Sequence, residues 1–137
     1  MKVTLGSTGI TAEKNGFGAL PIQRISEEDA VKLIQKAYKA GITYFDTAIS
    51  YTDSEVKLGK AFEGIREKVL IATKTPAQNA AGFWSDLDKS LKSLKTDYID
   101  IYQMHWPDPS VPLEETAEAL TIMKESGKIR YVGLSNF

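Results

Sequence analysis

The amino-acid sequence predicts an α/β fold in which helices cover a parallel sheet. Short apolar runs typical of buried strands alternate with longer segments whose apolar residues recur at helical spacing. Strands and helices that alternate in this way form parallel sheets through right-handed crossovers. The chain has 137 residues, which is about the length of one domain. We therefore expect residues 1–137 to form a single domain.

The strands are predicted from short β-prone runs bounded by turn residues. Two such runs flank the turn Gly6-Ser7-Thr8-Gly9 and predict an antiparallel hairpin. A third run, residues 17–20, is ended by Pro21, and its small residues, Gly18 among them, would let another backbone or a flat ligand come close. The remaining strands are expected at residues 42–46, 69–73, 98–104 and 129–134.

Four helices are predicted between these strands. The first has Ser26 as its N-cap and ends at Gly41. The second is expected to open with a capping box at Thr52-Asp53-Ser54-Glu55 and to end at Gly64. The third carries an apolar stripe of Trp84, Leu87, Leu91 and Leu94, and the fourth runs over about residues 113–126 with Ala117, Leu120 and Met123 facing inward.

Polar residues lie at the ends of four of the predicted strands. They are Asp46, Lys74, His105 and the pair Ser135-Asn136, and Tyr51 lies in the loop after the first of them. Because the carboxyl ends of parallel strands share one edge of a sheet, these side chains should converge there. A carboxylate at the end of a buried strand is costly unless a partner neutralises it. The sequence therefore predicts a polar site at this edge.

The residue types at this edge indicate acid–base chemistry. A lysine ammonium beside the hydroxyl of Tyr51 favours the phenolate, so this phenol is suited to donate a proton to a developing alkoxide. His105 could hold the same carbonyl oxygen. Each residue also has a structural interpretation: Asp46 and Lys74 as a neutralising pair, His105 as a half-buried polar side chain, and Ser135-Asn136 as a polar turn.

Composition excludes several other classes of function. The net charge of −1 gives no indication of nucleic acid or of an anionic membrane surface as partners. No cysteine is present and only one histidine, so thiolate catalysis and disulfides are excluded and a metal site is disfavoured. No apolar run approaches the roughly 18 residues of a membrane span. The first residues lack the apolar core of a signal peptide, and we expect a cytoplasmic location.

Four motifs together resemble the N-terminal part of an aldo-keto reductase. They are Phe45-Asp46-Thr47-Ala48 with Tyr51 and Ser54-Glu55, Ala72-Thr73-Lys74, Gln103-Met104-His105-Trp106, and Gly127 to Phe137. The resemblance spans the whole chain and implies a (β/α) barrel of the TIM type. The barrel would be incomplete here, with an N-terminal hairpin, about five parallel strands and four helices. Residues 21–24 and 51–55 resemble a prokaryotic branch that often carries a ferredoxin-like C-terminal extension.

The same resemblance implies an enzyme that reduces aldehydes or ketones to alcohols. Its catalytic tetrad would be Asp46, Tyr51, Lys74 and His105. In that family the tyrosine is the general acid, the lysine and aspartate tune it, and the histidine orients the carbonyl. Hydride comes from bound NADPH, less often from NADH. Cofactor contacts are implied for Gly18, Asp46, Ser135 and Asn136, substrate contacts for Ile22 and Trp106, and no metal is involved.

The chain supplies all four tetrad residues but only part of the predicted barrel. A complete barrel takes about 250 residues, and the groups that grip most of the cofactor would lie in its second half. We expect a fragment or truncation product that associates with another copy or with the missing half. A half-barrel that binds a partner without turnover is the alternative function. A phosphate-handling barrel isomerase is disfavoured, because no acid–base residue is paired with a glycine-rich phosphate loop.

Overall fold

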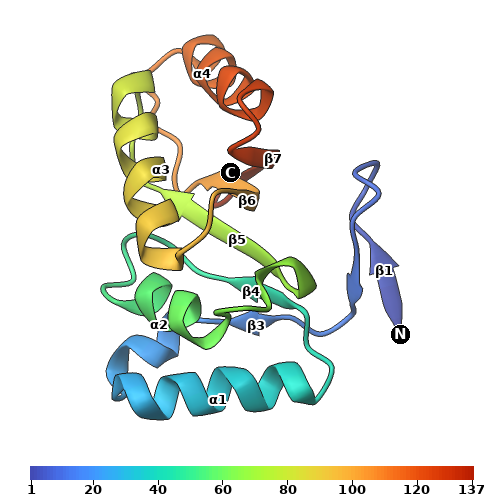
Figure 1. Cartoon of the computed structure of the whole chain (residues 1–137). Coiled ribbons are helices and arrows are strands. Elements are labelled where there is room, and N and C mark those ends of the chain that lie inside the picture. The colour runs from blue at the N-terminus through green and yellow to red at the C-terminus, as the bar shows by residue number, and fades with distance from the viewer.

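The computed structural model describes all residues 1–137 and contains a hairpin, a five-stranded parallel sheet and four α-helices (Figure 1). The strands are β1 (Lys2–Thr4), β2 (Thr11–Glu13), β3 (Phe17–Gly18), β4 (Tyr44–Asp46), β5 (Leu70–Thr75), β6 (Ile99–Met104) and β7 (Ile129–Leu134). The helices are α1 (Glu27–Lys39), α2 (Ser54–Ala61), α3 (Ala80–Leu94) and α4 (Leu113–Glu125), with 3₁₀ turns η1 (Leu20–Arg24) and η2 (Arg66–Lys68). None of these helices has the length and apolarity needed to cross a membrane.

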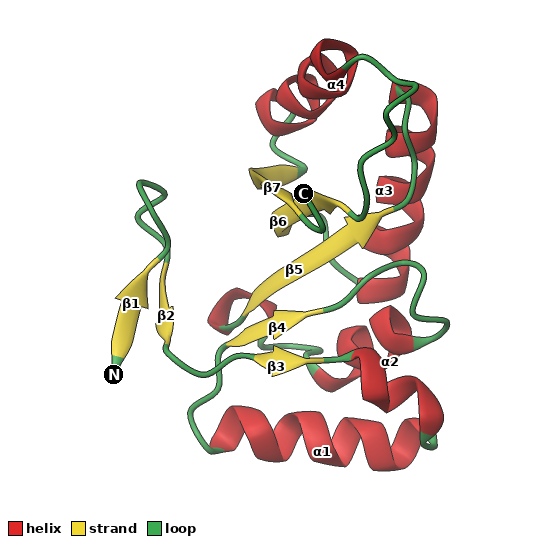
Figure 2. Cartoon of the chain, turned by 180° about the vertical axis from the view of Figure 1, so that it is seen from behind, coloured by secondary structure: helices red, strands yellow, loops and turns green.

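The sheet follows the order of the chain, β3-β4-β5-β6-β7, and every neighbouring pair is parallel. All five strands therefore present their carboxyl ends at one edge, which confirms the fold class predicted from the alternation of elements. The helices lie along the outer side of the curved sheet, and the hairpin stands apart from them (Figure 2). The outermost strands, β3 and β7, each leave one edge without a partner strand.

The helix starts confirm one predicted cap and correct another. Ser26 accepts a hydrogen bond from the backbone N–H of Asp29 at 3.1 Å, as expected of an N-cap. The predicted capping box at residues 52–55 is wrong, because α2 begins at Ser54 and its N-cap, Asp53, makes no side-chain cap bond. Ser54 and Glu55 are buried between α2 and the sheet and bond to groups there instead.

Two further predictions need correction, one about the end of a strand and one about the buried face of a helix. Lys74 does not follow a strand but lies within β5, where it pairs with Gln103 in register. The strand pairing continues to Thr75, opposite Met104. Ala117 is exposed, whereas Thr116, Ala119, Leu120 and Met123 form the buried face of α4. Those four share one face of the helix, whereas Ala117 is rotated about 100° around the helix axis from Thr116.

The apolar core lies between the helices and the outer face of the sheet. Phe45 of β4 packs edge-on against Phe62 with 4.7 Å between ring centroids, and Ile71, Leu87 and Tyr102 are fully buried in the same cluster. The close approach of α2 and α3 depends on Gly59, where an added Cβ would lie 2.4 Å from the carbonyl oxygen of Ser93.

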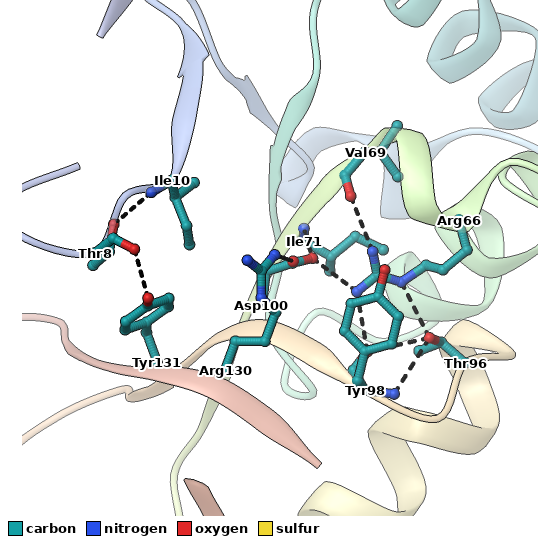
Figure 3. A network of polar contacts seen from close by, with 10 residues as sticks. All are labelled: Thr8, Ile10, Arg66, Val69, Ile71, Thr96, Tyr98, Asp100, Arg130 and Tyr131. Atoms are coloured by element: carbon teal, nitrogen blue, oxygen red, sulfur yellow. Dashed lines mark hydrogen bonds and ion pairs between the residues drawn. The ribbon is translucent and has the colours of Figure 1, made fainter. Parts of the chain in front are cut away.

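A second polar network joins the amino ends of the strands, opposite the predicted site (Figure 3). The buried carboxylate of Asp100 accepts hydrogen bonds from Arg66 Nη2 at 2.8 Å, from Arg130 Nη1 at 2.8 Å and from the Ile71 amide at 3.0 Å. Tyr131 of β7 donates its hydroxyl to the carbonyl of Thr8 in the hairpin turn. These bonds connect β5, β6, β7 and the hairpin at the end of the sheet away from Lys74.

Candidate active site

An ion pair at the carboxyl edge of the sheet forms the centre of the site. Asp46 is the last residue of β4, and its Oδ2 accepts a hydrogen bond from Lys74 Nζ at 2.6 Å. The same ammonium donates to the carbonyl of Thr47 at 2.9 Å. The side chain of Lys74 is 8% exposed and that of Asp46 is 34% exposed. The Asp46 carboxylate and the Thr47 carbonyl therefore hold the nearly buried ammonium of Lys74, while the carboxylate stays partly open to solvent.

Tyr51 and His105 meet above this pair. The ammonium of Lys74 lies 5.3 Å from the centroid of the Tyr51 ring, and the Tyr51 and His105 rings are 5.7 Å apart in an edge-on arrangement. Tyr51 belongs to the loop between β4 and α2, whereas His105 directly follows β6. The structure thus brings together Asp46, Tyr51, Lys74 and His105 from three neighbouring segments.

His105 is held in a form suited to hydrogen bonding with a neutral ligand. His105 is 4% exposed, and its Nδ1 is buried without a protein hydrogen-bond partner. Burial, and then the charge of Lys74, lower the pKa of His105 below its ordinary value, while Asp46 acts in the opposite direction. The neutral imidazole is therefore favoured near pH 7. The indole of Trp106 stacks on this ring at 3.6 Å and remains 47% exposed.

The residues after β7 present free polar groups at the same edge. Asn136 donates its side-chain amide to the carbonyl of His105 at 2.8 Å and to Ser135 Oγ at 3.1 Å. The amide oxygen of Asn136 and the hydroxyl hydrogen of Ser135 have no protein partner, so one acceptor and one donor are available. A carboxamide needs such a pair.

The first barrel strand supplies open space rather than side chains. Gly18 pairs with Asp46 in register, and a Cβ added there would meet no atom within 4 Å. A flat group can therefore approach the backbone at this position. Ile22 of η1 is 2% exposed and packs in the apolar core, whereas Leu20 at the start of the same turn is 43% exposed.

Gln103 is a site residue that the sequence reasoning missed. Its Nε2 donates to Asp46 Oδ1 at 3.3 Å, on the oxygen that Lys74 leaves free. Gly133 of β7 allows this placement, since a Cβ there would lie 2.8 Å from Gln103 Cγ. The available signal was strand periodicity: Gln103 is two residues before His105, and alternate residues of a strand share one face.

Comparison with known proteins bears directly on this arrangement. The sequence profile described as the Aldo/keto reductase family matches residues 3–137. The chain belongs to the aldo/keto reductase family. It is 40% identical to Aldo-keto reductase YhdN of Bacillus subtilis, over 98% of this chain and 46% of that protein. It is 38% identical to Probable aldo-keto reductase 1 of Glycine max, over 97% of this chain and 44% of that protein.

Solved structures of family members superpose closely on this half-barrel. Aldo-keto reductase AKR11C1 of Bacillus halodurans, in its holo form, matches with a TM-score of 0.95 and 32% identity, over 99% of this chain and 50% of that one. An aldo/keto reductase of Klebsiella pneumoniae, solved with NADP and acetate, matches with a TM-score of 0.88 and 31% identity, over 94% and 47% of the two chains. The chain thus spans about half the length of these relatives and matches part of their barrel.

Proposed function

We propose that this chain carries the acid–base half of an NAD(P)H-dependent reductase that converts aldehydes and ketones to alcohols. One observation carries the proposal: the ammonium of Lys74, fixed by Asp46 and the Thr47 carbonyl, lies 5.3 Å from the ring of Tyr51. Such a cation favours the phenolate that remains after Tyr51 has given up its proton. The relatives named above, one of them solved with NADP, support the choice of redox chemistry.

Each tetrad residue has a separate task in this proposal. Tyr51 donates its hydroxyl proton to the carbonyl oxygen as that oxygen gains negative charge. Lys74 stabilises the phenolate left on Tyr51, and Asp46 holds Lys74 in place. His105, as a neutral imidazole, offers a hydrogen bond that orients the carbonyl through its other ring nitrogen, Nε2, because Nδ1 is buried.

The polar groups around the tetrad fit a nicotinamide. Bound NAD(P)H would supply the hydride. The Ser135 hydroxyl and Asn136 Oδ1 would hold its carboxamide, the first as a donor and the second as an acceptor. The open space at Gly18 gives a flat ring access to the sheet edge beside Asp46. The exposed face of Trp106 borders the carbonyl substrate.

A non-catalytic, partner-binding half-barrel is the second candidate. It is favoured by the unpaired edges of β3 and β7 and by an apolar cavity of about 460 Å³ between α4 and β7. Exposed apolar side chains line this cavity: Leu113, Val132, Leu134 and Phe137. Association through such edges, with another copy or with a complementary half-barrel, would pair them and cover the apolar side chains.

Turnover of the purified chain separates the two candidates. The assay is the oxidation of NADPH with a reactive aromatic aldehyde, run on the chain, on Tyr51→Phe and on Tyr98→Phe. Tyr98 lies at the opposite end of the sheet, where its ring packs under Arg66, so this control removes a phenol oxygen remote from the tetrad. The proposal expects Tyr51→Phe to lose roughly 10²–10⁴-fold in kcat, with Tyr98→Phe unchanged. Equal turnover in both variants, or none in the unmodified chain, contradicts reduction by this chain.

A further inference from the structure

The first turn of α2 buries polar side chains that a helix start normally leaves in water. Ser54 is 0% exposed and Glu55 is 4% exposed, although the turn follows the Tyr51 loop at the mouth of the site. Neither side chain caps its own helix. Buried polar groups are costly unless they are bonded, so the partners of Ser54 and Glu55 explain why the chain keeps them there.

Ser54 connects the Tyr51 loop to the residues that follow β3 and β4. Its backbone N–H donates to the carbonyl of Tyr51 at 2.9 Å. Its hydroxyl donates to the carbonyl of Ala19, after β3, at 3.1 Å, and lies 2.8 Å from the hydroxyl of Thr47. Thr47 is the residue whose carbonyl accepts from Lys74 Nζ. Through its backbone and its hydroxyl, Ser54 thus joins the loop of the proposed acid to a residue that holds the proposed cation.

Glu55 fixes the same turn to β5. The hydroxyl of Thr73 donates to Glu55 Oε1 at 2.5 Å within the layer between α2 and the sheet. Thr73 directly precedes Lys74, and the two side chains point to opposite faces of β5. Burial raises the pKa of Glu55; the hydroxyl bond from Thr73 lowers it, and the nearby charge of Asp86 raises it further. The bond ties the start of α2 to the backbone segment that carries Lys74.

The phenol of Tyr51 depends on these attachments because its side-chain oxygen has no protein hydrogen-bond partner in the structure. Its backbone is held by an N–H bond to Ala48 at 3.1 Å and by the bond from Ser54. We infer that Ser54 and Glu55 are positioning residues that hold the Tyr51 loop against Thr47 and β5, and so place the phenol beside Lys74. This inference rests on the proposed function for its catalytic meaning.

A matched pair of substitutions tests the inference. Thr73→Val removes the hydroxyl that bonds Glu55, whereas Thr116→Val makes the same change at another buried threonine, in α4, whose hydroxyl has no partner. Glu55→Gln keeps an oxygen that can accept from Thr73 and serves as the conservative variant. Ser54→Ala is a second, independent variant that breaks the bonds to Ala19 and Thr47.

The readout is the fluorine NMR spectrum of the full chain labelled with 3-fluorotyrosine. The chain has six tyrosines, and the Tyr51 signal is identified by its loss in Tyr51→Phe. We expect Thr73→Val and Ser54→Ala to shift or broaden this signal and to leave that of Tyr131, at the far end of the sheet, unchanged. Thr116→Val and Glu55→Gln should keep the Tyr51 signal in place. If these bonds only stabilised the fold, Thr73→Val and Ser54→Ala would lower the melting temperature without moving the Tyr51 signal.

Turnover gives a second readout that separates this inference from the proposed function. Because a displacement of about 1 Å can cost roughly 10²-fold, kcat should fall by up to about that factor in Thr73→Val and Ser54→Ala, with KM for the aldehyde changed much less. An unmoved Tyr51 signal in both variants overturns the positioning role, whether or not the chain is active. Absence of turnover in the unmodified chain contradicts only the proposed function, since the NMR comparison is independent of turnover.

Discussion

The carboxylate of Asp100 is expected to contribute more to stability than any surface ion pair of this chain. It is 2% exposed and accepts three hydrogen bonds, two of them from arginine guanidinium groups. Removing one member of a buried charged pair typically costs about 3–5 kcal/mol, because the partner stays buried and unpaired. Arg66 keeps bonds to the carbonyls of Val69 and Tyr98, which places Asp100→Ala near the low end, about 3 kcal/mol.

The measurement is urea unfolding followed by far-ultraviolet circular dichroism, with calorimetry for the melting temperature. A loss of about 3 kcal/mol corresponds to a decrease of about 10 °C for a chain of this length. The control is Arg130→Gln, which breaks another bond of the same carboxylate from a side chain that is 48% exposed, so the expected cost is below about 1 kcal/mol. Equal losses in the two variants, or a loss below about 1 kcal/mol in Asp100→Ala, would refute the burial argument.

Two further predictions concern packing and pH. Gly59→Ala should lower the free energy of unfolding by about 2 kcal/mol in the same urea assay, because the clash with the Ser93 backbone outweighs the helix propensity gained; a stabilised variant would contradict this. The lowered pKa of His105 means that the unfolded chain binds its proton more readily. Stability from this group is therefore fully present above about pH 6.5 and lost as the pH falls through the folded-state value. His105→Asn should flatten that decline, and an unchanged profile between pH 7.5 and 5 would count against it. The raised pKa of Glu55 acts in the opposite sense, with stability lost as the pH rises.

The convergence of the site was predictable from local sequence because parallel topology leaves little freedom. Once Asp46, Lys74 and His105 are assigned to the ends of successive strands, right-handed crossovers bring them to one edge. The structure places them there, with Tyr51 in the loop above. The hairpin and the five strands were predictable for a similar reason, since each is a short β-prone run between turn or helix signals.

The role of residues 54 and 55 was not predictable from local pattern. A serine and a glutamate at a helix start match the chemistry of a cap, which depends only on neighbours in the sequence. In the structure their partners are Ala19, Thr47 and Thr73, which follow β3, follow β4 and lie in β5. Gln103 was missed in the same way, since its partner Asp46 is 57 residues away along the chain.

The sequence by itself determined the order of elements, the parallel sheet and the set of residues at its carboxyl edge, because these follow from periodicity, turn chemistry and the handedness of crossovers. Only the tertiary structure decided which polar side chains are buried and what they bond. Burial is a property of the assembled layers: the same serine or glutamate caps a helix in water and ties a helix to a sheet when the sheet lies against it. Here that difference decides how the Tyr51 loop is held beside Lys74.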